Sequence, residues 1–260
     1  MTATGLSIVT LSFNQAPYLG ECLASVLSQE AEREYIVVDP GSTDGSREIL
    51  RGRAGIDRLV LEPDLGPADG LNKGFSRAGG QIFGYLNADD RLAPGALAFV
   101  GEFFRRHADV DVLCGTIRII DRQGRPGLRK RTADAFDLAR YAAGICTVGQ
   151  QATFFRRSAF ERAGGFNAQN RISWDGELLV DLALAGARFA TTRRILGDFR
   201  IYGESITGSG RHADRARREH ERISQKIRQA GVRLYGRRER ALQRLFYKAS
   251  LSRHLGYLLA

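Results

Sequence analysis

Apolar residues follow two alternating spacings through the first half of the chain. Short, continuously apolar or β-branched runs are typical of strands covered on both faces, and they lie at residues 6–12, 35–39, 58–62 and 81–86. Apolar residues that recur every three to four positions predict helices with one buried face, and they lie at residues 17–29, 46–53, 68–78 and 94–107. Strands and helices that alternate in this way predict a doubly wound α/β sheet.

The second half of the chain is less regular. Its apolar runs predict strands within residues 110–121 and 151–155, and a helix over 176–185. Beyond Arg211 the spacing predicts basic amphipathic helices, which two glycines in the 230s interrupt.

Basic residues are concentrated at the C-terminus. The net charge is +10, and residues 211–253 contain 14 basic and 4 acidic residues, so the first 210 residues are formally neutral. We therefore expect a globular domain over residues 1–210 and a basic amphipathic helical tail over residues 211–260.

Composition excludes several classes of protein. A chain of 260 residues that is 43% hydrophobic and 26% charged is neither collagen-like nor disordered. No apolar run is long enough to cross a bilayer, and the first five residues lack the features of a secretory signal. The three cysteines lie far apart, which is not typical of a zinc site or a disulfide framework. We therefore expect a protein of the reducing cytoplasm.

Polar side chains follow each of the first four predicted strands. Asn14 comes after the first strand, Asp39 after the second, residues 62–69 after the third and residues 87–90 after the fourth. Ligands of doubly wound sheets bind beyond the carboxyl ends of the strands. We therefore expect these acidic and amide groups to gather at one edge of the sheet.

Asp89 and Asp90 form an adjacent pair directly after the fourth predicted strand. Like charges this close raise each other's pKa unless a cation or hydrogen-bond donors compensate them. A divalent ion such as Mg²⁺ or Mn²⁺ suits the pair, because it takes oxygen ligands from carboxylates and from substrate phosphates. The alternative is a solvated turn that caps the next helix, and the position of the pair beside Asp39 and Asp69 favours the ion.

Two further segments suit a nucleotide. Asp39 could accept hydrogen bonds from a base or ribose, and Gly41 in the same loop permits close backbone approach. Asp44 in that loop is better interpreted as a helix cap. Lys73 could counter the charge of a diphosphate, although a solvated surface lysine is an equal alternative.

The segment Trp174-Asp175-Gly176-Glu177 precedes an apolar helix. A carboxylate beside the single tryptophan could lie in a partly dry pocket, where a raised pKa suits a general base. Asp175 could equally be the N-cap of the helix, with Glu177 in its first turn. The chain contains no Walker A sequence and no nucleophile elbow.

In combination, these segments resemble the family 2 glycosyltransferases, which have the nucleotide-diphospho-sugar transferase (GT-A) fold. The matching segments are SIVTLSFNQ at 7–15, YIVVDPGSTDGS at 35–46, NKG at 72–74, NADD at 87–90, QATFFR at 151–156, GGF at 164–166 and WDGEL at 174–178. The resemblance implies a Rossmann-like, mixed and mostly parallel sheet flanked by helices, with the basic helical tail as a C-terminal extension.

The resemblance also implies roles for individual residues. Asp89 and Asp90 would hold the divalent cation against the diphosphate of a sugar nucleotide. Asp175 would take a proton from the acceptor hydroxyl, with Glu177 as the fallback for this catalytic role. The implied donor-binding residues are Thr10, Leu11, Phe13, Asn14, Asp39, Gly41, Asp69, Lys73, Asn87 and Asp89.

Three positions depart from the family pattern. Pro40 stands where many members have a second acid that helps to read the nucleobase. Asp175-Gly176-Glu177 replaces the more usual acidic motif near the base. Tyr202 stands where members often carry a histidine, so the cation would depend on Asp90 and the donor phosphates.

The basic tail has two interpretations. It could pack on the domain as a solvated helical hairpin, or attach to anionic lipid headgroups. The residues that would serve the second role are Arg215, Arg218, Arg222, Lys226, Arg237, Arg240, Arg244 and Lys248, with Leu242, Leu245, Phe246, Leu251, Leu255 and Leu258. We do not expect nucleic acid binding, because the neutral domain carries no nucleic-acid motif.

The sequence therefore predicts an inverting glycosyltransferase with a nucleoside-diphosphate sugar donor and a glycan or lipid-linked acceptor. We expect it in the cytoplasm, at the inner face of the membrane if the tail binds lipid. A catalytically inactive sugar-nucleotide-binding scaffold is the alternative. A nucleotidyltransferase would need a glycine-rich, arginine-containing segment after the first strand, and residues 10–15 offer none.

Overall fold

The computed structural model describes residues 5–203 and 212–256, with side chains up to Tyr247. Its strands are β1 Leu6–Leu11, β2 Arg33–Val38, β3 Arg58–Val60, β4 Ile82–Asn87, β5 Arg91–Leu92, β6 Val112–Ile120, β7 Pro126–Arg131, β8 Thr153–Arg156 and β9 Phe189–Arg200. Its helices are α1 Ala16–Leu27, α2 Ser46–Arg51, α3 Pro67–Phe75, α4 Ala96–Arg106, α5 Leu138–Ala142, α6 Arg157–Arg162, α7 Trp174–Leu184, α9 Ala213–Gln229 and α10 Arg237–Gly256, with a 3₁₀ turn η1 at Gln150–Ala152.

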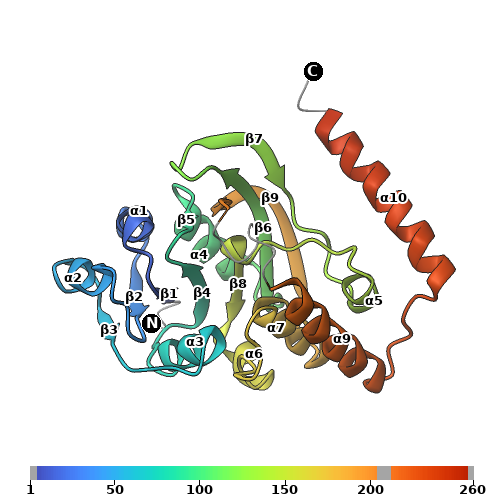
Figure 1. Ribbon diagram of the computed structural model, residues 1–260, viewed down its shortest axis with the longest axis horizontal. Helices are drawn as coiled ribbons and strands as arrows, with labels where there is room; N and C mark the ends of the chain where they lie inside the picture. Colours follow the sequence, from blue (N-terminus) through green and yellow to red (C-terminus); the bar gives the residue numbers. More distant parts are fainter. Residues whose placement is uncertain (1–4, 204–211, 257–260) are drawn as a thin grey trace.

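Over the described residues, the strands form one mixed sheet in the order β3-β2-β1-β4-β8-β6-β9-β5, with β7 paired to β6 (Figure 1). The first four strands in this order are parallel, whereas β8 is antiparallel to both of its neighbours. The strand order reverses at β1: β2 and β3 follow on one side of β1, and the chain then crosses back to place β4 on its other side. A reversal of this kind opens a crevice at the carboxyl ends of the strands, where ligands bind.

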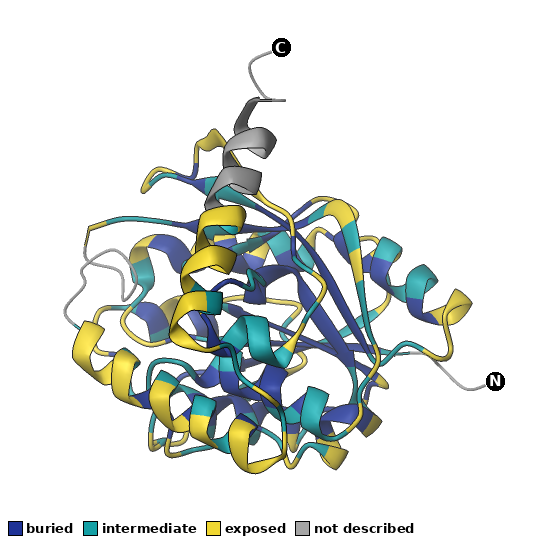
Figure 2. Cartoon of the chain, turned by 90° about the vertical axis from the view of Figure 1, so that its right-hand side faces the viewer, coloured by how far each residue is buried: buried dark blue, intermediate teal, exposed yellow. Residues whose placement is uncertain are grey.

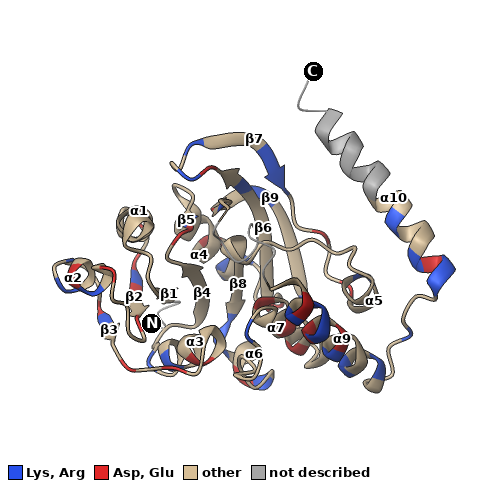
Figure 3. Cartoon of the chain, viewed as in Figure 1, with Lys and Arg blue, Asp and Glu red and all other residues tan. Residues whose placement is uncertain are grey.

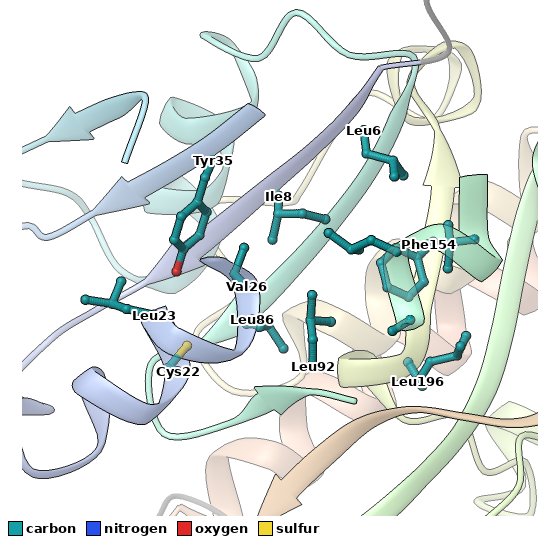
Figure 4. Packing of buried hydrophobic residues seen from close by; sticks show 14 of the residues in the cluster. Leu6, Ile8, Cys22, Leu23, Val26, Tyr35, Leu86, Leu92, Phe154 and Leu196 are labelled. Carbon is teal, nitrogen blue, oxygen red and sulfur yellow. The ribbon is translucent and has the colours of Figure 1, made fainter. Parts of the chain in front are cut away.

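Helices cover both faces of the sheet. Alternate residues of β1 point to opposite faces, so Ile8 packs with α1, α2 and α4, while Val9 packs with α3, α6 and α7. Figure 4 shows the first cluster, in which Cys22 and Tyr35 lie among leucines with no access to solvent. The expected α/β class with helices on both faces is therefore confirmed.

Several elements were not predicted from the sequence. The long strand β9 contains Thr191, Thr192, Arg193 and Arg194, so its apolar signal is interrupted. The hairpin strand β7 is exposed along its whole length and has no apolar face to detect. Both strands form because backbone hydrogen bonds to β6 specify them, not because they bury a regular side-chain pattern.

The two C-terminal helices behave differently. Helix α9 packs against α5 and α7, with Ile223 and Ile227 fully buried. Helix α10 extends away from the body, and its outer side is exposed (Figures 1 and 2). Its described anchors include Arg244, which donates to the carbonyl of Ala143. Of the tail residues predicted to bind lipid, the side chains of Lys248, Leu251 and Leu255, and the whole of Leu258, lie outside the described residues.

Candidate active site

The loops that follow β1 and β2 are joined by their own side chains. Asn14, which has a positive φ of 52°, accepts a hydrogen bond from the amide of Thr43, and its own amide donates to Ser42 Oγ. Asp44 accepts from the amide of Ala16 and so caps the start of α1. Asn14 therefore holds this edge of the sheet together, and its predicted contact with a nucleotide stays a prediction.

Asp39 lies inside its loop with its carboxylate fully buried. It accepts hydrogen bonds from the amides of Gly41 and Ser42, from Ser42 Oγ at 2.6 Å, and from Arg47 Nε at 3.1 Å. Burial alone would raise its pKa, but these donors lower the pKa below its ordinary value. Each oxygen is thus engaged by the protein, and it is the adjacent Pro40 that lies at the surface of a cavity.

That cavity, which we call the β1–β3 cavity, has a volume of about 570 Å³. It is lined by apolar side chains and by two charged residues, Asp64 and Arg171. The apolar lining residues are Leu11, Phe13, Pro40, Pro63, Leu65 and Pro67. Phe13 and Leu65 are exposed at its surface. Burial raises the pKa of Asp64. The cavity is lined mainly by apolar side chains, with one acid and one guanidinium, which suits an aromatic heterocycle.

Thr10, Asp69 and Lys73, which were also predicted to bind the donor, do not line this cavity. Thr10 lies in the core, where its hydroxyl hydrogen-bonds Tyr35 Oη at 2.9 Å. Lys73 forms an ion pair with Asp69 at 3.1 Å and donates to the carbonyl of Pro63. Asp69 also accepts from the amide of Leu65. Asp69 and Lys73 therefore stabilise the turn that forms one wall of the cavity.

The acidic turn 87–90 follows β4. Asp90 is buried, and Arg200 N donates to its Oδ1 at 2.9 Å, while Gln150 and Gln151 donate to its Oδ2 at 3.2 and 2.8 Å. Asp89 is less enclosed and accepts a hydrogen bond from Tyr202 Oη at 3.0 Å. The structure thus brings the two predicted cation-binding carboxylates together but gives them different surroundings.

Arg200, which is fully buried, stabilises this turn through hydrogen bonds. Arg200 Nε donates to the carbonyl of Asp89 at 2.7 Å, its other nitrogens reach the 121–122 carbonyls and Glu21, and its guanidinium lies over the ring of Tyr18. Burial raises the pKa of Asp90 well above its ordinary value, and the charge of Asp89 adds to this effect. Burial also raises the pKa of Asp89, against the hydrogen bond from Tyr202.

A divalent cation fits these residues in chemical terms. Both carboxyl groups supply the oxygen ligands that Mg²⁺ and Mn²⁺ prefer. The guanidinium of Arg200 donates to backbone carbonyls and to Glu21, and in the described part of the chain it forms no ion pair with either carboxylate. Among the described residues, no group of three or more histidine, cysteine, aspartate or glutamate side chains surrounds a common point. Asp89 and Asp90 would therefore supply only part of the oxygen ligands that such a cation takes.

Asp175 lies at a separate cavity of about 210 Å³, which we call the Asp175 cavity. Its walls are mostly aromatic and aliphatic: Tyr85, Tyr141, Cys146, Val148, Gln150, Thr153, Phe155, Ile172, Ser173, Leu178 and Leu179. A β-carbon on Gly176 would collide with Tyr141 Oη, so a larger residue beside the acid would require the Tyr141 ring to move. Burial raises the pKa of Asp175. A carboxylate in such surroundings is suited to accept a proton near neutral pH.

One side chain joins the two regions. Gln150 donates from Nε2 to Asp90 and also lines the Asp175 cavity, and its Oε1 has no hydrogen-bond partner within the described part of the chain. The sequence analysis did not single out Gln150, although it immediately precedes the quoted 151–156 segment. The acidic turn and Asp175 are therefore neighbours across one glutamine, as a site with two reacting groups requires.

Glu177 does not line either cavity. Its carboxylate is fully buried and is bound by Arg222 and Lys226 of α9, and by Asn167 and Asn170. Burial would raise its pKa, but these donors lower the pKa to about 2. A carboxylate with this pKa is a poor proton acceptor at neutral pH, so the geometry separates Glu177 from Asp175.

Comparison with known families adds a separate line of evidence. Residues 7–164 match the family model described as glycosyl transferase family 2. An uncharacterized glycosyltransferase of Mycobacterium tuberculosis is 31% identical over 220 residues, which are 82% of this chain and 79% of the relative. A PGL/p-HBAD biosynthesis glycosyltransferase of Mycobacterium bovis is 33% identical over 185 residues, which are 67% of this chain and 69% of the relative.

Solved structures share the fold at lower identity. Staphylococcus aureus TarS, residues 1–349 in complex with UDP-GlcNAc, has a TM-score of 0.62 at 20% identity and matches 79% of this chain. The mannosyltransferase PcManGT of Pyrobaculum calidifontis, in complex with GDP-Man and Mn²⁺, has a TM-score of 0.61 at 22% identity and matches 86% of this chain. The matched parts are 60% and 64% of those two solved chains.

Proposed function

Because the chain belongs to glycosyl transferase family 2, we propose that it is a metal-dependent, inverting glycosyltransferase that uses a nucleoside-diphosphate sugar. The neighbours of similar fold bind UDP-GlcNAc and GDP-Man, and these names support a sugar-nucleotide donor. The observation that carries the proposal is the position of Asp175: it lies in a cavity that shares Gln150 with the acidic turn.

The donor would occupy the edge between the β1–β3 cavity and the acidic turn. Leu11, Phe13 and Pro40 would contact the nucleobase, with Asp64 as a hydrogen-bond acceptor. Asp89, backed by Asp90, would hold a Mg²⁺ or Mn²⁺ ion, which supplies charge neutralisation at the leaving diphosphate when bound. Tyr202 keeps the Asp89 carboxylate in place through its hydrogen bond.

The acceptor hydroxyl would enter the Asp175 cavity. Asp175 takes the hydroxyl proton as the oxygen forms a bond to the anomeric carbon, and the bond from that carbon to the diphosphate oxygen breaks. The electron pair leaves with the nucleoside diphosphate. Attack from the face opposite the diphosphate inverts the anomeric configuration in one step.

A thermal-shift screen tests the donor assignment. UDP, GDP and other nucleoside diphosphates are added with and without Mn²⁺, because a ligand that binds the folded state raises its apparent stability. We expect one base to be preferred and Mn²⁺ to increase the shift. The Asp89→Ala variant should lose the Mn²⁺-dependent part of the shift.

Turnover assays test the base. Asp175→Asn should lower sugar-nucleotide turnover by a factor of about 10² to 10⁴, the usual contribution of a general base, and Asp90→Ala should lower it too. The exposed Asp109 supplies the matched control, since Asp109→Asn should leave turnover unchanged. Unchanged turnover in both Asp175→Asn and Asp90→Ala would reject this assignment of the site.

A catalytically inactive scaffold is the second candidate, and two observations favour it. Asp39 is fully engaged by its own loop, and Tyr202 stands beside Asp89 as a hydrogen-bond donor. A scaffold would show nucleotide-dependent stabilisation in the screen but no turnover of any sugar nucleotide. Turnover that depends on Asp175 would exclude it.

We further propose that the acceptor is a glycan or is lipid-linked, and that the protein works at the cytoplasmic face of a membrane. The relative named for PGL/p-HBAD biosynthesis supports such an acceptor. No helix in the described parts of the chain has both the length and the apolar character to cross a bilayer. Helix α10 exposes Leu242, Leu245 and Phe246 beside several arginines, which suits a surface of anionic lipid (Figure 3).

A further inference from the structure

Helix α9 lies outside the segment 7–164 that matches the family, yet it places a buried acid beside the Asp175 cavity. Glu219 is 8% exposed, and its carboxylate faces the turn that leads into α7. Its Oε1 accepts from Arg171 N at 3.0 Å, and its Oε2 accepts from Ile172 N at 3.0 Å and Ser173 N at 2.9 Å. Three consecutive backbone N–H groups therefore converge on one carboxylate from the tail.

The turn that Glu219 binds carries residues of both cavities. Arg171 lines the β1–β3 cavity, where its side chain lies against the bare Cα of Gly66. Ile172, Ser173 and Asp175 line the Asp175 cavity. One carboxylate from α9 thus fixes the backbone from which a guanidinium reaches one cavity and the candidate base reaches the other.

The amides of this turn are bound by side chains other than that of the N-cap residue. Ser173, at the N-cap of α7, makes no side-chain capping hydrogen bond, so the acceptors at the start of α7 come from other residues. Asn170 Oδ1 shares two of the same amides, at 3.2 and 2.9 Å. Glu219 completes this set, and the pKa of its carboxyl group is lowered because the three amide hydrogen bonds outweigh its burial.

The rest of the same face of α9 also binds α7. Arg222 and Lys226 bind Glu177, and Lys226 also pairs with Asp181. Ile223 and Ile227 are fully buried against Val180 of α7 and Ala142 of α5. These positions recur every three to four residues, so one continuous stripe of α9 is matched in charge and shape to the helix that begins at the candidate base.

We propose that Glu219 of helix α9 is a positioning residue that holds Arg171 and Asp175 in their places. The inference rests on the proposed function, because it assigns catalytic consequences to a structural anchor. It gives the first helix of the basic tail a role that is separate from any binding to lipid.

Two substitutions test the role of Glu219. Glu219→Ala removes all three acceptor contacts, whereas Glu219→Gln keeps one carbonyl oxygen and most of the volume. We expect hydrogen–deuterium exchange at the amides of residues 171–173 to accelerate in Glu219→Ala, most strongly at Arg171, because Asn170 still accepts from the other two amides. The acceleration should be smaller in Glu219→Gln. Turnover of UDP-GlcNAc or GDP-mannose with Mn²⁺, whichever the wild type uses, should fall by a factor of about 10 to 100 in Glu219→Ala, as expected for a misplaced reacting group. Glu219→Gln should recover part of that loss.

Two control variants separate positioning from stability. Ile227→Ala removes buried volume at the other end of the α9 interface and should lower the melting temperature by at least as much as Glu219→Ala. Asp214→Asn changes an exposed acid on the same helix. Assayed well below the melting temperature of the least stable variant, both controls should keep wild-type turnover and wild-type exchange at residues 171–173.

Three results would overturn the proposal. The first is unchanged exchange at residues 171–173 in Glu219→Ala, and the second is full turnover in a variant whose turn has lost its protection. Equal loss of turnover in Ile227→Ala at matched stability would also reject it, because the effect would then follow stability alone. Failure of the proposed function would look different: the wild type itself would turn over no sugar nucleotide, and a catalytic role for Glu219 would fall with it.

Discussion

At the scale of single residues, the main feature is that the chain buries acids where burial is unfavourable. Asp175 lies in a cavity with aromatic and aliphatic walls, and its carboxylate accepts a hydrogen bond from the adjacent Gly176 amide. Burial raises its pKa. Natural proteins keep such a group only where it is useful, since removing it usually increases stability.

Asp175 should therefore oppose stability at neutral pH. In the unfolded chain an aspartate has a pKa of about 3.9, and the pKa of Asp175 in the folded state is higher. Below both pKa values Asp175 is protonated in the folded and in the unfolded state, so it does not lower the free energy of unfolding. The loss of unfolding free energy grows as the pH rises from the unfolded pKa to the folded pKa, and it stays constant at higher pH. We expect Asp175→Asn to raise the melting temperature at pH 7 but not at pH 3, measured by calorimetry. A lower melting temperature in Asp175→Asn at pH 7 would contradict this account.

If Asp175 is the general base that we propose, the same pKa should set the pH dependence of turnover. A general base acts only when it is deprotonated, so the acid side of the rate profile should fall at a pH above the value of about 4 expected for an ordinary aspartate. The measurement is sugar-nucleotide turnover at saturating donor between pH 4 and 9. A profile that is flat down to pH 4 would exclude Asp175 as the base.

Arg200 is the residue on which the acidic turn depends. It is fully buried, and its guanidinium group donates hydrogen bonds to three backbone carbonyls and to the Glu21 carboxylate. Arg200→Ala would leave these acceptors unpaired, so we expect a loss of at least about 3 kcal/mol of unfolding free energy in denaturant titration. Arg193, exposed on the same strand, is the control: Arg193→Ala should change stability by less than about 0.5 kcal/mol.

The residue types that carry charge at strand ends could be predicted, but their partners could not. Asp89, Asp90 and Asp175 stood out because each follows a clear pattern in the local sequence. Gln150 and Glu219 did not, since their contacts join segments tens of residues apart and depend on the folded topology. For the same reason the engagement of Asp39 by Arg47 was not foreseen.

At the scale of helices and strands, regular burial decided what the sequence could predict. The strands with continuous apolar runs, β1, β2 and β4, were located to within two residues at each end. Helix α9 was expected from its spacing, and it packs by a stripe of only two fully buried isoleucines. Strands β7 and β9 were missed because polar residues interrupt or replace their buried faces.

The contact between α9 and α7 should depend on pH. Arg222 binds both oxygens of the buried Glu177, so Arg222→Ala should cost about 2 kcal/mol at pH 7. Glu177 has a pKa of about 2 when folded and about 4.3 when unfolded. Its contribution is therefore present above pH 4.3 and is lost as the pH falls towards 2. The difference between the wild type and Arg222→Ala should shrink over that range in pH-dependent unfolding.

Arg218→Ala is the comparison for this prediction. Arg218 is exposed on α9 and should contribute little at any pH. A cost for Arg222→Ala that stays constant between pH 5 and pH 2 would show that the Glu177 contact does not carry the effect.

At the scale of the whole molecule, the basic residues of helix α10 lie apart from the candidate active site. Acidic residues lie in the acidic turn and on α7, whereas the charged residues of β7 and of the described part of α10 are mainly basic (Figure 3). Helix α10 projects from the body with Leu242, Leu245 and Phe246 exposed (Figure 2). This arrangement allows the body and the projecting helix to have different partners.

Removal of α10 should abolish binding to anionic membranes and spare the site. A variant that ends at Tyr235 keeps α9 but lacks the cations and leucines of α10, each cation being worth about 1 kcal/mol near an anionic surface. We expect the full chain, but not the shortened one, to co-sediment with phosphatidylserine vesicles, and the binding to weaken with salt. Vesicles of phosphatidylcholine alone are the control, and equal co-sedimentation of both chains would refute a role for α10.

The three cysteine thiols differ in their exposure to solvent, and this difference can be used to probe the Asp175 cavity. Cys22 and Cys114 are buried in the core, whereas Cys146 is partly accessible in the wall of the Asp175 cavity. A maleimide should therefore react first at Cys146, slowly, because burial raises the pKa of this thiol. Protection from alkylation would then report, by mass spectrometry alone, whether a candidate acceptor fills that cavity, before any linkage or product is known.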